Sequence, residues 1–149
     1  WTKATCVHTP IISSLKASGA RMESFDHKMS KSDPGGAVLL HDEPDELRGK
    51  LRKAYLDPED PESPVHELVE QIILPQIGCL NITPDPKYGE PSTWDDLAAL
   101  RKVLAAGDVH PLDYKLAVAD ALSGLLAPLA EHFAAAPELL NSVTEITSD

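Results

Sequence analysis

The chain has 149 residues, of which 42% are hydrophobic and 25% are charged, and such values are typical of a folded globular protein. The net charge of −11 excludes nonspecific binding of a phosphate backbone over the whole surface, so any contact with nucleic acid must be local. No apolar stretch approaches the ~20 residues that cross a bilayer, and the spacing of Cys6 and Cys79 suits neither a disulfide framework nor a metal site. We therefore expect a soluble, cytoplasmic protein without a membrane or metal partner.

The first part of the chain has the pattern of an α/β layer. Residues 4–7 read as a short buried strand with no earlier element to pair with, so we expect that further protein precedes Trp1. Residues 13–26 are predicted to be a polar loop, and residues 28–36 a second loop that concentrates lysines, serines and glycines. Residues 37–40 are compatible with a short strand or with a turn into the first helix.

Two helices are predicted next. The first begins at Pro44, a residue suited to the first helical position, and its inward face is formed by Leu47, Leu51 and Tyr55. The second begins at Ser63 and Pro64 and ends at Gly78. Its predicted inward positions are Val65, Leu68, Val69, Ile72, Ile73 and Ile77.

A proline-rich segment, residues 81–92, is predicted to be an irregular connection and not a strand. Thr93 and Asp96 have the spacing of a capping box. They are expected to open a third helix that ends before Gly107, with Leu97, Leu100 and Leu104 facing inward.

The last and longest predicted helix begins at His110 and Pro111, and Pro128 is expected to kink or interrupt it. Its predicted inward positions are Leu112, Leu116, Ala119, Leu122, Leu126, Leu129 and Phe133. Beyond Pro137 we expect a frayed tail with a short turn at 138–143. The predicted fold is thus mainly α: the end of an α/β layer to about residue 40, then a bundle of roughly four helices.

Residues 28–36 carry the clearest chemical signal. Two lysines supply positive charge, two serines supply hydroxyl donors, and the glycines let backbone N–H groups approach an anion. Such a loop beside a strand end is where α/β sheets bind phosphates. The residues alone leave a second interpretation open, a solvated surface loop.

The order of these residues adds to that interpretation. Lys28, Met29, Ser30, Lys31 and Ser32 reproduce the KMSKS signature of class I aminoacyl-tRNA synthetases. Residues 6–12 resemble the strand and turn that lead into this loop in tyrosyl-tRNA synthetases of the archaeal and eukaryotic type. Residues 42–55 resemble the helix that follows the loop in that family.

The second half of the chain carries an independent resemblance. Tyr88 with Gly89, and the run from His110 to Asp113, stand at the spacing of two motifs that contact the anticodon in that family. The resemblance covers about residues 3–133 and corresponds to the C-terminal portion of these enzymes. It implies that residues 1–40 end a Rossmann catalytic domain with the KMSKS loop, and that residues 41–149 form a helical anticodon-binding domain.

The resemblance also implies roles for the loop residues. Lys28 and Lys31 would stabilise the pyrophosphate of ATP while tyrosyl-adenylate forms, and Ser30 and Ser32 would position the loop. Met29 belongs to the same ATP-binding motif. ATP with Mg would be a substrate of the intact enzyme, and no tightly bound cofactor is implied.

For the anticodon, the implied partner is tRNA(Tyr). Tyr88 would stack on a base, Asp113 would accept hydrogen bonds from the Watson–Crick edge of guanine, and His110 would contact the middle base. Local sequence alone leaves structural roles open. His110 could cap the last helix, Asp113 could stabilise that helix by interacting with its dipole, and Tyr88 could be a core aromatic.

The sequence contains no HIGH motif and none of the family's tyrosine-binding residues, so we do not expect this chain alone to activate tyrosine. By resemblance, the intact enzyme is expected to be a homodimer and this chain a monomer. Two alternative functions remain: part of a tryptophan–tRNA ligase, or a noncatalytic tRNA-binding module.

Overall fold

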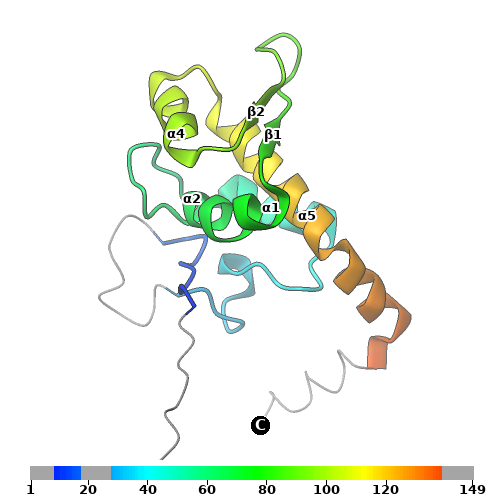
Figure 1. Cartoon of the computed structure of the whole chain (residues 1–149). Helices are drawn as coiled ribbons and strands as arrows, with labels where there is room; N and C mark the ends of the chain where they lie inside the picture. The colour runs from blue at the N-terminus through cyan, green and yellow to red at the C-terminus, as the bar shows by residue number, and fades with distance from the viewer. Residues whose placement is uncertain (1–8, 18–27, 139–149) are drawn as a thin grey trace, which may run out of the picture.

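A computed structural model describes residues 9–17 and 28–138. The strand predicted at 4–7 lies outside the described residues, as do most of the loop predicted at 13–26 and the turn predicted after residue 138. The elements follow in the order η2 (Pro34–Gly36), α1 (Pro44–Lys53), α2 (Pro64–Leu68), η3 (Val69–Ile73), α3 (Leu74–Ile77), β1 (Leu80–Ile82), β2 (Ser92–Trp94), α4 (Leu97–Ala106) and α5 (Pro111–Ala135). The described fold is therefore mostly helical, with a small two-stranded sheet (Figure 1).

Helix α1 begins at Pro44, as predicted. Acidic residues occupy its first turn and basic residues its last turn, and these charges stabilise the helix by interacting favourably with its dipole. Leu47 and Leu51 are fully buried. The inward position predicted for Tyr55 is wrong, because the helix ends at Lys53 and Tyr55 lies half-buried beyond it.

The predicted helix from Pro64 to Gly78 is confirmed in extent but not in regularity. It consists of α2, a π-helical turn (η3) and α3, and Gly78 ends it with a φ of 87°, a left-handed conformation that glycine adopts without strain. A π turn holds more residues than an α turn and so rotates the face that follows. Ile77, predicted to face inward, is accordingly 44% exposed.

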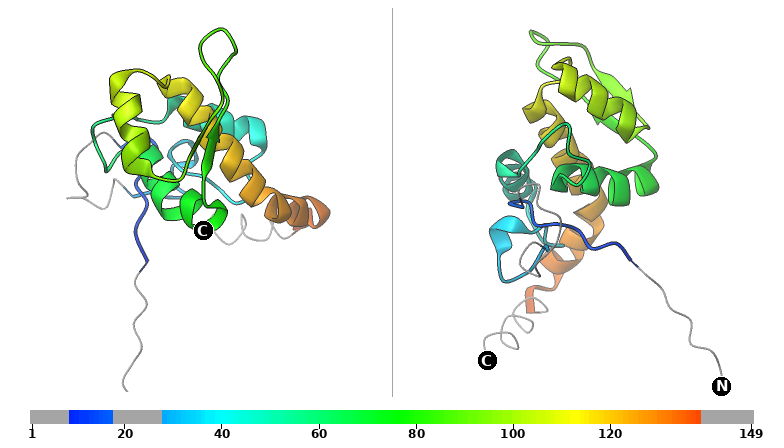
Figure 2. Two further views of the ribbon diagram at one scale, coloured as in Figure 1. Left: turned by 45° about the horizontal axis from the view of Figure 1, so that its top comes forward. Right: turned by 90° about the vertical axis from the view of Figure 1, so that its left-hand side faces the viewer.

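A β-hairpin occupies the region predicted to be irregular. Strands β1 and β2 pair antiparallel, with Leu80 opposite Trp94 and Ile82 opposite Ser92. The prediction for 81–92 is therefore wrong at both ends of that segment, because its prolines lie between the strands and leave the ends free to pair. The loop between the strands projects beyond the helices (Figures 1 and 2).

The capping box predicted for α4 is only half present. Asp96 caps the helix by accepting a hydrogen bond of 2.8 Å from the backbone N–H of Ala98. Thr93 instead belongs to β2, where its hydroxyl donates to Asn81 Oδ1 at 2.7 Å. The predicted end at Gly107 is confirmed, with a φ of 82°.

Helix α5 runs through Pro128 to Ala135, so the predicted interruption is wrong, and the alternative of a kink stays a prediction. Its buried residues are Tyr114, Ala117, Val118, Ala119 and Leu122. Of the predicted inward positions, Leu129 is 42% exposed. The reason is that the C-terminal part of α5 extends past the other helices (Figure 2).

By length and composition, α5 is the one helix among the described residues that could cross a bilayer. Core helices of soluble proteins meet the same criterion. Here its first half packs against α1, β1 and η3, so the criterion is weak evidence for a membrane span.

One core holds the described residues together. Leu15, from the segment before α1, is 1% exposed and belongs to the same cluster as Leu47, Leu51 and Tyr114. The backbone N–H of Tyr55 donates to the carbonyl of Leu15 at 2.7 Å. Of the α/β layer expected up to residue 40, the described residues show an isolated antiparallel bridge and no strand.

A buried polar pair joins α2 to α5. His66 and Tyr114 are both 0% exposed, and 2.9 Å separates His66 Nδ1 from the Tyr114 hydroxyl. Burial, assisted by the positive charge of Arg101, lowers the pKa of His66 to about 4, whereas Asp57 and Asp60 act less strongly in the opposite direction. Sequence periodicity missed His66, because it placed the inward face on the apolar positions around it.

This pair makes stability depend on pH. The folded pKa of His66 lies below its unfolded value of 6.5, so its contribution is complete above pH 6.5 and is lost as the pH falls toward 4. We predict that protonation of His66 removes about 3 kcal/mol of the free energy of unfolding over that range. Urea unfolding of wild type and His66→Gln measures this loss. The difference in free energy of unfolding between the two proteins should shrink as the pH falls. A difference that stays constant from pH 7 to pH 4 contradicts the prediction.

Candidate nucleic-acid interface

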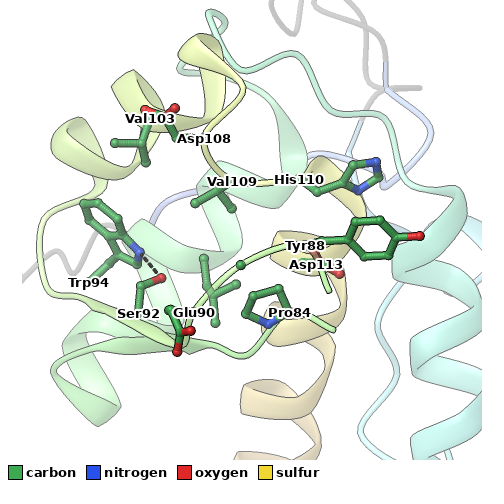
Figure 3. A pocket seen from close by; sticks show the side chains of 12 residues that line it. Pro84, Tyr88, Glu90, Ser92, Trp94, Val103, Asp108, Val109, His110 and Asp113 are labelled. Carbon is green, nitrogen blue, oxygen red and sulfur yellow. Dashed lines mark hydrogen bonds between the residues drawn. The ribbon is translucent and has the colours of Figure 1, made fainter. Parts of the chain in front are cut away.

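A pocket of about 190 Å³ lies between the β1–β2 hairpin and the start of α5 (Figure 3). It brings together Tyr88, His110 and Asp113, the three residues for which the family resemblance implies anticodon contact. In Figure 3 these three lie at one end of the pocket and Trp94 lies at the other. The KMSKS residues do not line this pocket.

Tyr88 lies in the hairpin loop and is 81% exposed. Its backbone N–H donates to the carbonyl of Asp85 at 2.8 Å, which closes a tight turn just before the ring. Such exposure excludes the role of a core aromatic. The ring therefore offers a flat apolar face at the rim of the pocket, where a base could stack.

His110 is the N-cap of α5, in agreement with the structural interpretation of its place in the sequence. Its Nδ1 accepts a hydrogen bond of 3.1 Å from the backbone N–H of Leu112. In a neutral imidazole whose Nδ1 is an acceptor, the proton resides on Nε2. The exposed ring thus caps the helix with one nitrogen and retains a donor on the other.

Asp113 lies in the first turn of α5, where the helix dipole favours a negative charge, and it is half-buried. Glu90 and Asp108 also line the pocket. Among the described residues that line it there is no lysine or arginine. Three carboxylates without a cation favour a ligand that presents N–H donors, and they disfavour a bare phosphate.

The other end of the pocket holds its apolar side chains, with Asp108 beside Val103 (Figure 3). Trp94, Val103 and Val109 line it, and Trp94 Nε1 donates to Ser92 Oγ at 2.9 Å (Figure 3). That bond fixes the indole ring against the hairpin. Sequence reasoning missed Glu90 and Trp94, which the hairpin pairing brings to the pocket, and Asp108, which lies between α4 and α5. An apolar wall beside a rim of acceptors suits a flat, hydrogen-bonding ring.

Met29 anchors the start of the KMSKS loop through its backbone and its side chain. The backbone N–H of Met29 donates to the carbonyl of Ile12 at 2.9 Å, and Met29 Sδ accepts from the N–H of Val38 at 3.3 Å. Ser30 Oγ and Ser32 Oγ lie 2.9 Å apart. Lys28 and Lys31 are both exposed.

A second cavity of about 500 Å³ lies beside this loop, between Lys16, Gly35 and helix α1. Lys50 Nζ lines it but lies 2.5 Å from Asp42 Oδ1 and 3.2 Å from Glu46 Oε1. Lys16 Nζ lies 2.6 Å from Asp33 Oδ1. These carboxylates neutralise Lys16 and Lys50, and a third lysine, Lys53, also lines the cavity. Within residues 9–17 and 28–138, no group of three or more His, Cys, Asp and Glu could hold a metal ion.

Comparison with known proteins gives one family. Residues 20–127 match the family described as tRNA synthetases class I (W and Y). The chain is 36% identical over 132 residues to the tyrosine–tRNA ligase of Picrophilus torridus, a match that covers 87% of this chain and 39% of that protein. It is 40% identical over 121 residues to the enzyme of Thermococcus kodakarensis, covering 80% of this chain and 32% of that protein.

Solved structures of the same kind of enzyme are similar to this chain. The tyrosyl-tRNA synthetase of Pyrococcus horikoshii, complexed with L-tyrosine, matches with a TM-score of 0.76 and 35% identity over 88% of this chain and 38% of that one. The Aeropyrum pernix enzyme matches with a TM-score of 0.74 and 30% identity over 95% of this chain and 39% of that one. The chain thus spans between about a third and two fifths of the length of these relatives.

The turn that ends the KMSKS loop depends on Gly36. A Cβ there would lie 2.5 Å from both Asp33 Oδ2 and Ser14 Oγ, whose side chains bond Lys16 and the carbonyl of Gly36. We predict that Gly36→Ala lowers the free energy of unfolding by about 1–3 kcal/mol, because these short side chains must give up their bonds. Thermal unfolding would measure it.

Gly49 provides the matched control. It lies within α1, and a Cβ added there would meet no atom within 4 Å, so Gly49→Ala should stabilise the chain by up to about 1 kcal/mol. Equal effects of the two substitutions would contradict the account of the turn.

Proposed function

The chain belongs to the class I tRNA synthetases of the tryptophanyl and tyrosyl type, and we propose that it serves a tyrosine–tRNA ligase in two ways. Its KMSKS loop assists the ATP-dependent activation of tyrosine, and its helical part recognises the anticodon of tRNA(Tyr). The observation that carries the second role is the pocket that unites Tyr88, His110 and Asp113 from two distant segments.

The pocket chemistry suits a purine with adjacent donors. The exposed ring of Tyr88 supports stacking. Asp113 accepts hydrogen bonds from the N1–H and N2–H groups of guanine, since two carboxylate oxygens match two neighbouring donors. His110, whose Nδ1 is engaged in capping, presents its Nε2–H to an oxygen of the middle base.

The loop residues act on the leaving group. The carboxylate of tyrosine attacks the α-phosphorus of ATP, the bond to the β-phosphate oxygen breaks, and pyrophosphate departs with the negative charge. Lys28 and Lys31 stabilise that charge, and the hydroxyls of Ser30 and Ser32 hold the loop in shape. Met29 anchors the loop, because its Sδ accepts a hydrogen bond from the backbone N–H of Val38. ATP arrives with Mg as substrate, and no resident cofactor is required.

Two further candidates are less well supported. A tryptophan–tRNA ligase shares the family match, but the relatives named above carry the tyrosine–tRNA ligase name. A noncatalytic tRNA-binding module would have no use for an anchored KMSKS loop. One Arabidopsis thaliana relative is named a cytoplasmic tyrosine–tRNA ligase, which favours a cytoplasmic location here. We expect this chain alone to be monomeric and the whole enzyme to be a homodimer.

For the anticodon role, we predict that the chain binds a tRNA transcript with a GUA anticodon more tightly than one with CCA. Tyr88→Ala and Asp113→Ala should each reduce this preference about tenfold, through lost stacking and lost base contact. Binding titrations at low and high salt measure it, because salt weakens the backbone contribution common to both transcripts.

The matched control for the anticodon test is Asp45→Ala, which removes an exposed carboxylate from the first turn of α1, outside the pocket. It should keep the preference for GUA. Equal binding of both transcripts by the wild-type chain contradicts the anticodon role.

For the loop, we predict that Lys28→Ala in a ligase containing this chain lowers the rate of tyrosyl-adenylate formation about a hundredfold with little change in the KM for ATP. The reason is that the lysine stabilises charge that develops only in the transition state. ATP–pyrophosphate exchange measures this rate. Lys102→Ala, an exposed lysine on α4, is the control and should leave it unchanged. An unaltered rate in Lys28→Ala rules out the assigned role.

A further inference from the structure

The first turn of α5 is held by polar contacts in three directions. His110 caps the helix through the N–H of Leu112 at 3.1 Å. Tyr114 meets His66 of α2 at 2.9 Å. Lys115 Nζ donates to the carbonyl of Ala54 at the end of α1, at 2.6 Å. Asp113, the residue that faces the pocket, stands between Leu112 and Tyr114.

Helix geometry links these contacts. Successive residues of an α-helix point about 100° apart, so the direction of Tyr114 determines the direction of Asp113. With Tyr114 in the core, Asp113 lies at the pocket. A rotation of the first turn would move the carboxylate away from the place where a base has to meet it.

Apolar packing alone does not fix that rotation sharply. Contacts between apolar groups have no preferred direction, whereas a hydrogen bond restricts both distance and angle. The bond from His66 Nδ1 to Tyr114 links the imidazole to α5, whereas its other polar contact, with the backbone of Asp57, links it to the segment after α1. Neither His66 nor Tyr114 lines the pocket, so the pair acts on the site only through α5.

We propose that His66 is a positioning residue of the anticodon pocket: its buried hydrogen bond to Tyr114 sets the rotation of the first turn of α5 and so holds Asp113 at the pocket. This proposal rests on the proposed anticodon function. The proposal goes beyond that function, because it assigns a part in base specificity to a buried side chain that does not line the pocket.

A double substitution separates positioning from stability. Tyr114→Phe removes the hydroxyl and leaves His66 Nδ1 buried without a partner, which destabilises the fold. The combination of His66→Leu with Tyr114→Phe replaces both partners by apolar groups, and this restores much of the stability. Leu104→Ala is the control, because it weakens the same core through an apolar side chain of α4 and removes no hydrogen bond of the pair.

The first readout is the ratio of affinities for transcripts with GUA and CCA anticodons, at a temperature where every variant is folded. We expect this ratio to fall about tenfold in Tyr114→Phe and in the double variant. In Leu104→Ala it should equal the wild-type ratio. A double variant that regains both stability and the wild-type ratio overturns the proposal, since the pair would then only fill the core.

The second readout needs no RNA. In NMR spectra of the free chain, the backbone amide of Asp113 and the ring of His110 should shift in Tyr114→Phe and in the double variant, but not in Leu104→Ala. If wild type shows no preference for GUA, the anticodon function fails, and the NMR readout still decides the positioning. Unshifted Asp113 and His110 signals in both variants refute it.

Discussion

The packing of the first half of α5 against α1, β1 and η3 is the constraint on which both candidate sites depend. Tyr114 and Val118 are fully buried in this contact. Arg48 of α1 reinforces it through two hydrogen bonds to Asp120 of α5, at 2.7 and 2.6 Å. With α5 fixed in this way, its N-terminal end meets the hairpin, and the pocket forms where they meet.

The same core holds the KMSKS loop. Leu15 inserts its side chain among the helices, and its backbone bonds Gly36 on one side and Tyr55 on the other. Ser13 adds a hydrogen bond of 2.7 Å from its N–H to Glu67 of α2. The loop that is proposed to act on ATP is therefore attached to the body that is proposed to read the anticodon, while none of residues 28–32 lines the pocket beside the hairpin. This attachment gives the two sites a common rigid support.

Much of the fold could be predicted from sequence, because helix ends carry local signals. Pro44, Gly78 and Gly107 mark ends that the structure confirms. Features that depend on distant partners could not be predicted. The hairpin strands are three residues each and gain their order only from each other, and the π turn shifts a helical face by an amount that periodicity does not reveal.

The pocket residues also divide into those that a sequence motif identified and those that only the fold revealed. Tyr88, His110 and Asp113 were found through a family motif, whereas Glu90, Asp108 and Trp94 required the fold. The most direct test of the account is NMR shift mapping with a 15N-labelled chain and an anticodon stem-loop RNA carrying GUA. The account predicts that the largest shifts fall at the hairpin loop around Tyr88 and at His110 to Asp113. Shifts confined to other surfaces, or none at all, would contradict it.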